Sequence, residues 1–437
     1  RLSCDIKKMF MMYSCVSFHC RVLLPVLLVA TVCSCERRMP DTRLKSKAIS
    51  EVSDTTGTVV AKGFIPELPM DREDVRVVRI PAEPIWMYME DVVESYEFVP
   101  LETSPECLIG SINKIMHEDG MLLILDMSAN QALRFDEEGR FVCRYGDIGR
   151  ACNEYMSLTD MEYDRGSKEV ILVDRGGMKI LRFSHDGRFK SSTPMFFYIY
   201  RVCVLDGLWA IGCDAGGSDF PSAKGYSVLL SSESQDVFGK TLPKPNGVTR
   251  MRTHVVDYMS RKGDKVYYKQ FSSDTVWSVS KERCKAEFVV LHSDGGHTYT
   301  DDEVENMTMD LYFERTDAEE VFLGEFAETD DHYFFNVKRG SIRNYIVSKR
   351  TGREYCSELY ARNENNLFKT GWIVFNEALY ENKTFIGILE PDGVCREYNY
   401  IKERGDISQM PQVQRRLMER LSPEDNPVLM LVRLKPF

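Results

Sequence analysis

The two histidines whose spacing best suits metal binding are His292 and His297. They flank a Ser-Asp-Gly-Gly run, and Asp301 and Asp302 follow closely. Imidazole nitrogens and carboxylate oxygens can form a mixed site for a divalent metal ion. The same run also fits a glycine turn that leads into a helix cap, and no rigid element supplies a third ligand. His292 and His297 are therefore weak candidates for a metal site, and we expect no metal and no cofactor.

Catalytic carboxylates cannot be singled out from the sequence. A glycoside hydrolase needs two carboxylates about 5 to 10 Å apart across a pocket, and the chain has 67 acidic residues. Asp126 and Asp174 could converge on a channel, but we favour the alternative that each accepts hydrogen bonds from the backbone of the turn that follows it. No nucleophile-elbow, zinc-protease, Walker or dinucleotide-binding motif occurs. The sequence favours a non-enzymatic protein, with catalytic and ligand-binding residues unassigned.

Any such site must be positioned by a repeated structural unit. Three short motifs recur with a spacing of 48 residues. They are Ile124-Leu125-Asp126, Arg134-Phe135-Asp136 and Gly139-Arg140-Phe141, which return as Leu172-Val173-Asp174, Arg182-Phe183-Ser184 and Gly187-Arg188-Phe189. Each copy has the pattern of a meander of short antiparallel strands. A period of 40 to 50 residues is typical of a propeller blade, so we predict an all-β, six-bladed β-propeller of four-stranded antiparallel blades.

Six units fill the predicted propeller body, residues 75–437. They cover residues 112–155, 158–195, 202–242, 254–291, 322–359 and 372–400. Short helical insertions are expected at residues 300–307 and 407–421. We expect the early strands within residues 75–101 and the late strand 428–434 to share the last blade, because this closes the ring and removes exposed edges.

The N-terminal segment has the pattern of an export signal. Basic residues precede an apolar run at residues 22–32, which is too short to span a bilayer. Val32-Cys33-Ser34-Cys35 is similar to a bacterial lipobox, so residues 1–34 are predicted to be a lipoprotein signal peptide and Cys35 the lipidated residue. The alternative is an ordinary signal peptide with incidental cysteines. Residues 35–74, rich in Ser, Thr, Asp, Lys and Pro, are predicted to be a flexible tether.

Charge restricts the class of partner. The chain carries a formal net charge of -11, and nucleic-acid binding requires clustered Lys and Arg to neutralise phosphates. We therefore expect no nucleic acid partner. The predicted partners are a membrane, through the lipid anchor at Cys35, and a protein, peptide or glycan ligand.

Four stretches far apart in the chain resemble one protein family. They are residues 98–103, 115–155, 273–277 and 425–429. In this order they are similar to the NHL-like six-bladed β-propeller lipoproteins of Gram-negative gut bacteria, a largely uncharacterised family. The resemblance implies the propeller fold and a lipid-anchored location in the cell envelope, but no reaction. Because no Asp directly follows Cys35, the outer membrane is favoured over the inner one.

Three functions are open at this point. The first is a lipid-anchored binding or interaction module for a peptide, glycan or partner protein. The second is a propeller hydrolase or lyase that acts on glycans with carboxylates in the central channel. The third is a structural subunit of an envelope complex. A catalytic propeller should bring at least two carboxylates together in a funnel-shaped pocket, whereas a scaffold should have a plugged or water-filled channel.

Overall fold

The computed structural model describes most of the chain that follows the predicted tether. The described residues are 65–80, 85–213, 225–243, 258–263, 265–270, 273–292, 302, 306, 308, 314, 321–339, 341–369, 371, 375–381 and 383–437. His297, Cys35 and most of the helix predicted at residues 300–307 lie outside them.

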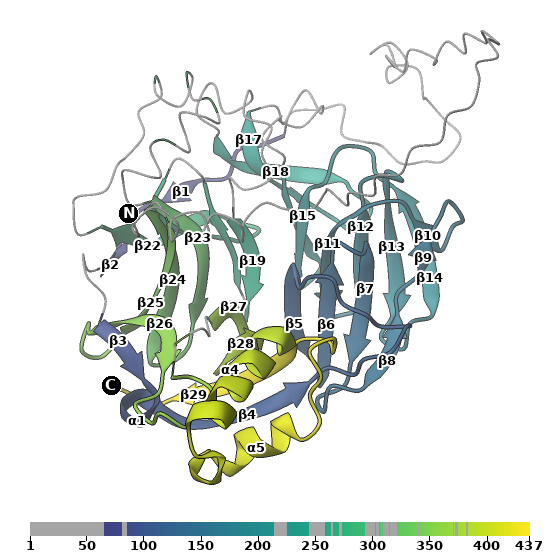
Figure 1. Ribbon diagram of the computed structural model, residues 1–437. Helices are drawn as coiled ribbons and strands as arrows, with labels where there is room; N and C mark the ends of the chain where they lie inside the picture. Colours follow the sequence, from purple (N-terminus) through teal and green to yellow (C-terminus); the bar gives the residue numbers. More distant parts are fainter. Residues whose placement is uncertain are drawn as a thin grey trace, which may run out of the picture. The chain divides into compact units, whose positions relative to one another are not determined.

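Six antiparallel sheets of four strands form the propeller (Figure 1). Blades 1 to 3 consist of β5 (Lys114–Glu118), β6 (Met121–Asp126), β7 (Gln131–Phe135) and β8 (Phe141–Arg144); β11 (Leu158–Asp164), β12 (Glu169–Asp174), β13 (Lys179–Ser184) and β14 (Phe189–Pro194); and β15 (Arg201–Leu205), β16 (Leu208–Gly212), β17 (Tyr226–Ser231) and β18 (Val237–Pro243). A two-stranded sheet of β9 (Asp147–Ile148) and β10 (Glu154–Tyr155) follows blade 1.

Blades 4 to 6 repeat the arrangement with longer connections. They consist of β19 (Tyr258–Lys262), β20 (Lys265–Lys269), β21 (Thr275–Val279) and β22 (Cys284–Leu291); β23 (Val321–Glu328), β24 (His332–Arg339), β25 (Ser341–Ser348) and β26 (Glu354–Tyr360); and β27 (Phe375–Tyr380), β28 (Thr384–Leu389), β29 (Val428–Leu434) and β4 (Val93–Pro100).

The first strands of successive blades form a closed ring. Each of β5, β11, β15, β19 and β23 contacts the first strand of the next blade, and β27 contacts β5. In blade 6, β4 from the beginning of the propeller pairs antiparallel with β29 near the end of the chain. The predicted six-bladed fold and its closure by N- and C-terminal strands are confirmed.

We expected the remaining early strands to join the last blade as well, but they do not. Instead β1 (Met70–Asp71) and β2 (Arg76–Arg79) pair parallel with β22, and β3 (Ile85–Tyr88) pairs parallel with β26 (Figure 1). The N-terminal segment thus runs along the outer edges of blades 4 and 5 before it completes blade 6. This arrangement covers edges that would otherwise present unpaired backbone groups.

The expected end of the tether at residue 74 also differs from the structure. Ile65 is buried, Glu67 forms a parallel bridge with Lys240 of β18, and Met70 pairs with Cys284. Residues 65–74 are therefore attached to blades 3 and 4, because their short extended segments find backbone partners at the blade edges.

Helices interrupt blade 6 between its second and third strands. They are α4 (Pro391–Arg404), the 3-10 helix η4 (Ile407–Gln409) and α5 (Gln412–Met418). The predicted unit 372–400 is thus wrong after residue 390, where Pro391 at the first helical position favours a helix start. The predicted helix 407–421 is present as η4 and α5, separated around Pro411. None of the helices in the described parts of the chain is both long and apolar enough to cross a membrane.

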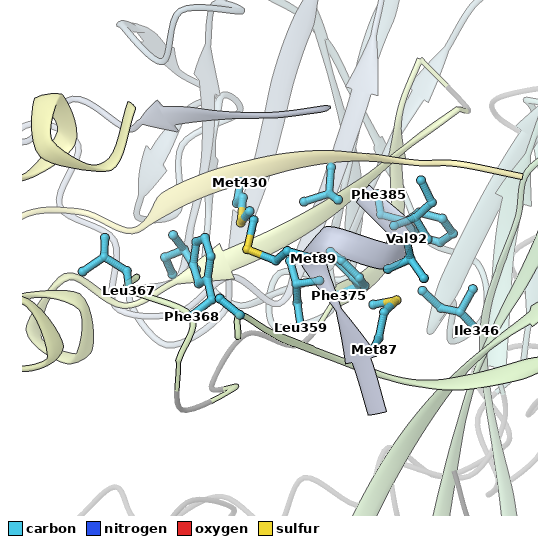
Figure 2. Packing of buried hydrophobic residues seen from close by; sticks show 14 of the residues in the cluster. Met87, Met89, Val92, Ile346, Leu359, Leu367, Phe368, Phe375, Phe385 and Met430 are labelled. Carbon is cyan, nitrogen blue, oxygen red and sulfur yellow. The ribbon is translucent and has the colours of Figure 1, made fainter. Parts of the chain in front are cut away.

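Apolar side chains between neighbouring blades form the core. Between blades 5 and 6, Figure 2 shows Met87, Leu359, Phe375, Phe385 and Met430 packed together. Met87 comes from β3 of the N-terminal segment, so that segment is part of the core as well as an edge. Val394 of α4 and Leu417 of α5 belong to the same cluster, which fixes the helices against the propeller.

The buried His332 in this region should make the free energy of unfolding depend on pH. Its ring centroid lies 4.5 Å from that of Phe437 and 6.4 Å from that of Phe385, and burial lowers its pKa to about 4 from an ordinary value of 6.5. The unfolded chain therefore binds a proton at a higher pH than the folded protein does. The contribution of His332 to the free energy of unfolding should be fully present above pH 6.5. It should fall by about 2 kcal/mol as the pH drops toward 4.

The His332→Phe variant isolates this effect. Carboxylates also titrate below pH 5, so we compare urea unfolding of the variant and the wild type at each pH. The variant should gain stability relative to the wild type as the pH falls from 6.5 to 4. A difference that does not change with pH would contradict the assignment to His332.

Candidate functional site

Of the two histidines of the predicted metal site, the structure describes His292. The imidazole is buried, and its Nε2 lies 3.5 Å from Oδ2 of Asp274. Over the described part of the chain, no three His, Cys, Asp or Glu side chains come close enough together to hold a metal ion. His297 is not among the described residues, so the metal candidate rests on one histidine and one carboxylate.

Asp126 and Asp174 have the structural role that we favoured for them. Oδ1 of Asp126 accepts a hydrogen bond of 2.9 Å from the backbone N–H of Ala129. Oδ1 of Asp174 accepts one of 3.0 Å from Gly177 in the equivalent turn of blade 2. Both carboxylates therefore stabilise the turn between the second and third strands of a blade.

The same two carboxylates have a second role that we did not predict. Asp126 also accepts a 2.7 Å hydrogen bond from the backbone N–H of Gly110, and Asp174 one of 2.9 Å from Ser157. Gly110 and Ser157 lie in the chain segment that enters each blade. Each aspartate thus joins a blade's entry segment to its central turn.

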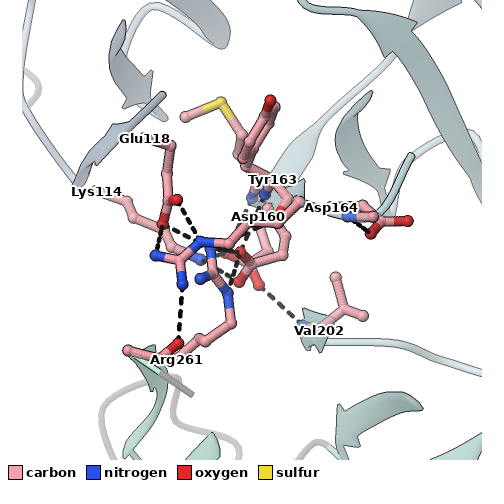
Figure 3. Close-up of polar contacts among 12 residues, drawn as sticks. Lys114, Glu118, Asp160, Tyr163, Asp164, Val202 and Arg261 are labelled. Carbon is pink, nitrogen blue, oxygen red and sulfur yellow. Dashed lines mark hydrogen bonds and ion pairs between the residues drawn. The ribbon is translucent and has the colours of Figure 1, made fainter. Parts of the chain in front are cut away.

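The central channel holds a network of buried charges that come from different blades (Figure 3). Nη2 of Arg261 on β19 donates to Oε1 of Glu118 on β5 at 2.6 Å and to Oε1 of Glu162 on β11 at 3.1 Å. Nζ of Lys114 donates to Oδ1 of Asp160 at 2.9 Å and lies 3.8 Å from Oε2 of Glu162. The side chains of Arg261 and Glu162 are only 3% and 2% exposed, so the charges neutralise one another away from bulk water.

Neighbouring groups complete the network. Nε of Arg165 donates to the other oxygen of Glu118 at 2.7 Å, and the backbone N–H of Val202 donates to Oδ2 of Asp160 at 2.9 Å. Burial alone would lower the pKa of Lys114, but Asp160 and Glu162 outweigh it and hold that pKa above its ordinary value. Lys114 therefore stays a cation and cannot act as a general base.

A cavity of about 330 Å³ lies beside this network in the channel. Its walls include Glu162 and Arg261 together with Glu328 and Lys349 from blade 5. Nζ of Lys349 lies 2.7 Å from Oε1 of Glu328. Two carboxylates, those of Glu118 and Glu162, thus converge on the cavity, as a hydrolase would require. Both carboxylates accept hydrogen bonds from the guanidinium of Arg261, so each is already paired within the network.

His117 is the histidine that lines the channel cavity. Its ring stacks on Tyr380 with centroids 3.9 Å apart, Nδ1 accepts from the backbone N–H of Glu381, and Nε2 lies 3.2 Å from Oε1 of Glu137. Tyr380 also reaches Glu137, at 3.1 Å, and burial together with that hydrogen bond raises the pKa of its hydroxyl to about 12. Both imidazole nitrogens have a polar partner. Because Tyr380 and Glu381 come from blade 6, His117 joins blade 1 to blade 6.

A second cavity, of about 560 Å³, lies between α5 and the segment that leads from β4 into blade 1. Apolar side chains form much of its wall, and two arginines stand on the helix side. The lining includes Phe98, Leu101, Val413, Leu417, Arg416 and Arg420. We call this space the α5 pocket.

Four exposed apolar side chains lie in and around the connections of blades 1 and 2. Leu108 and Met127 of blade 1 are 52% and 42% exposed, and Ile148 and Met156, between blades 1 and 2, are 64% and 42% exposed. Hydrogen bonds connect these loops, since Gln131 donates to the carbonyl of Leu108 and Asn130 to that of Met156. We call these four residues the apolar loop patch, and groups of this kind often mark interaction sites.

Comparisons with known proteins support the fold. A family model described as "Domain of unknown function (DUF4934)" matches residues 78–433. A crystal structure described as a "Putative exported protein" from Bacteroides fragilis NCTC 9343 is 16% identical, with a TM-score of 0.65 over 83% of this chain and 99% of that one. A member of the duf4221 family from Bacteroides vulgatus is 9% identical, with a TM-score of 0.44 over 79% of this chain and 98% of that one. No curated protein sequence matches the chain. The NHL-like lipoprotein assignment stays a prediction.

Proposed function

The chain belongs to the DUF4934 family, and we propose that it is a lipid-anchored propeller of the cell envelope that binds a peptide, glycan or partner protein. One observation carries the proposal: the charges in the channel satisfy one another, while the α5 pocket and the apolar loop patch are open to a ligand. Binding surfaces on loops held by a rigid scaffold are a common use of this kind of fold.

The alternative is a hydrolase or lyase that acts on glycans in the channel. Glu118 and Glu162 meet its first requirement, because they converge at the channel cavity. A catalytic carboxyl group must also be able to reach the substrate. Arg261 already forms ion pairs with both carboxylates, which is why we place binding first.

Glycan and peptide arrays probed with the purified full chain test the proposal. A binding module should be retained on particular spots and leave them chemically unchanged, as judged by mass spectrometry. An enzyme should shorten or unsaturate its spots, and Glu118→Gln and Glu162→Gln variants should stop that turnover. Turnover that depends on these carboxylates would overturn the binding proposal in favour of the alternative.

Lipidation at Cys35 is a separate prediction. The Cys35→Ser variant should lose incorporation of radiolabelled palmitate and move from the membrane to the soluble fraction, since lipid chains are the predicted anchor. Cys33→Ser is the matched control and should keep both properties. Label retained by the Cys35→Ser variant would rule out this anchor, and separation of inner from outer membranes would show which one holds the protein.

A further inference from the structure

The two arginines of the α5 pocket have no visible role within the protein. Arg416 on α5 and Arg420 in the turn after it lie four residues apart, so they share one side of the helical segment. Within the described parts of the chain, neither guanidinium forms an ion pair, a side-chain hydrogen bond or a ring contact. Two adjacent and uncompensated cations at a pocket favour an anionic ligand group.

The acidic residues of the pocket do not neutralise this pair. Glu102 accepts a hydrogen bond from the backbone N–H of Phe141, and Asp425 accepts one from Ser422. Glu97 lies next to Phe98 on β4, where neighbouring side chains point to opposite faces. Since Phe98 packs against the cluster that includes α5, the carboxylate of Glu97 points away from that side.

The pocket is held in shape by buried hydrogen bonds. Gln414 on α5 donates to Oδ1 of Asn366 at 2.9 Å and to the hydroxyl of Tyr96 on β4 at 3.3 Å, and it accepts from the backbone N–H of Leu367 at 3.0 Å. Gln414 is fully buried. A ligand would therefore meet walls that are already in place, which lowers the cost of binding.

The apolar part of the wall and the size of the pocket define the rest of the ligand. Val413 and Leu417 lie four residues apart on α5, Leu421 lies four residues further on, and Phe98 of β4 lines the pocket with them. A volume of about 560 Å³ lies within the usual range for ligand sites and exceeds the space that one side chain needs. The ligand should combine an apolar group with a neighbouring anion.

One side of the pocket borders the segment that carries Leu108 of the apolar loop patch. Asn426, which lines the pocket, accepts from the backbone N–H of Ile109, the residue after the exposed Leu108. A chain that leaves the pocket beside Asn426 would meet the segment that carries Leu108. This continuity favours an extended peptide over an isolated small molecule.

We propose that the α5 pocket binds an acidic peptide segment, with an apolar side chain inserted between α5 and β4 and a carboxylate held by Arg416 and Arg420. The inference rests on the proposed function and names the class of ligand for it. Each carboxylate would accept charge-assisted hydrogen bonds from the guanidinium pair.

Fluorescence anisotropy with the full chain and two labelled hexapeptide pools tests this inference. One pool contains Glu-Leu and Asp-Phe pairs, and the matched pool has Gln-Leu and Asn-Phe in their place. We expect the acidic pool to bind at least tenfold more tightly, and the double variant Arg416→Gln/Arg420→Gln to lose that difference. Arg404→Gln, a change of an exposed arginine on α4 outside the pocket, is the matched control and should bind like the wild type.

A further variant and two small-molecule controls complete the test. Val413→Trp fills the pocket without changing its charge and should also abolish peptide binding. Thermal unfolding checks that each variant is folded. Equal binding of both pools, unchanged binding by the double variant, or binding of decanoate or inorganic phosphate without any peptide would overturn the inference. If a ligand from the arrays binds the double variant as tightly as the wild type, the proposed binding function stands but the assignment of the ligand to the α5 pocket is wrong. If the protein binds neither an array ligand nor either peptide pool, the proposed function and the pocket assignment are both wrong.

Discussion

Replacing Arg261 with methionine is expected to lower the free energy of unfolding by about 3 kcal/mol or more. Arg261 donates to Glu118 at 2.6 Å and to Glu162 at 3.1 Å with its side chain only 3% exposed. Among the residues that the structure describes, methionine would leave the buried Glu162 with Lys114, at 3.8 Å, as its one cationic neighbour. An uncompensated buried charge costs far more than the loss of a surface ion pair.

Urea unfolding followed by tryptophan fluorescence measures this effect. Arg165→Met is the matched control, because Arg165 binds the same Glu118 but its side chain is 42% exposed, and it should cost about 1 kcal/mol or less. Adding Glu162→Gln to Arg261→Met should recover part of the loss. A loss of less than 1 kcal/mol for Arg261→Met alone would mean that the channel charges are well solvated.

The repeat predicted the fold because blades 1 and 2 keep the same turn chemistry. Asp126 and Asp174 recur since each must accept the backbone N–H groups of an equivalent turn. The early strands could not be assigned in the same way. Arg76–Arg79 is a four-residue strand at an outer edge, mostly exposed, and which blade it joins depends on where the chain passes rather than on its own pattern.

The channel network was largely hidden in the sequence because its members come from separate blades. One indication was available, since Asp160 and Glu162 lie two residues apart near the start of the predicted unit 158–195. Side chains at that spacing share a face, and here Met161 and Tyr163 turn to the core between blades 1 and 2 while the two acids turn away from it. Their partners Lys114 and Arg261 could be identified only once the ring was closed.

The motif Asp425-Asn426-Pro427, by contrast, was identified in the sequence through its family resemblance alone, and the structure supplies its reason. The side chain of Asn426 accepts from the backbone N–H of Ile109 at 2.8 Å and donates to the carbonyls of Glu102 and Cys107 at 2.7 and 2.8 Å. Its own backbone N–H donates to Thr103 at 2.9 Å. One amide thus joins the segment before β29 to the segment after β4, beside the strands that close the ring.

The Asn426→Leu variant should therefore lose about 4 kcal/mol of stability. Asn426 is 2% exposed, so leucine would leave the backbone N–H of Ile109 and the carbonyl of Cys107 without these partners, and each such group costs about 1 to 3 kcal/mol. The carbonyl of Glu102 would keep a hydrogen bond from the thiol of Cys107. Asn363→Ala is the matched control, since Asn363 is an exposed asparagine whose Oδ1 also accepts a backbone N–H, and it should cost less than about 1 kcal/mol.

The Asn426→Asp variant removes the two donated hydrogen bonds without changing the size of the side chain. Aspartate keeps the acceptor for Ile109 but places a carboxylate oxygen against the carbonyls of Glu102 and Cys107. It should be as destabilised as the leucine variant at pH 7 and should recover relative to it at acidic pH, where a protonated carboxyl group can donate again. If the aspartate variant equals the wild type at pH 7, the closing segments do not depend on the two donated hydrogen bonds, and β4 pairing with β29 alone holds the ring shut.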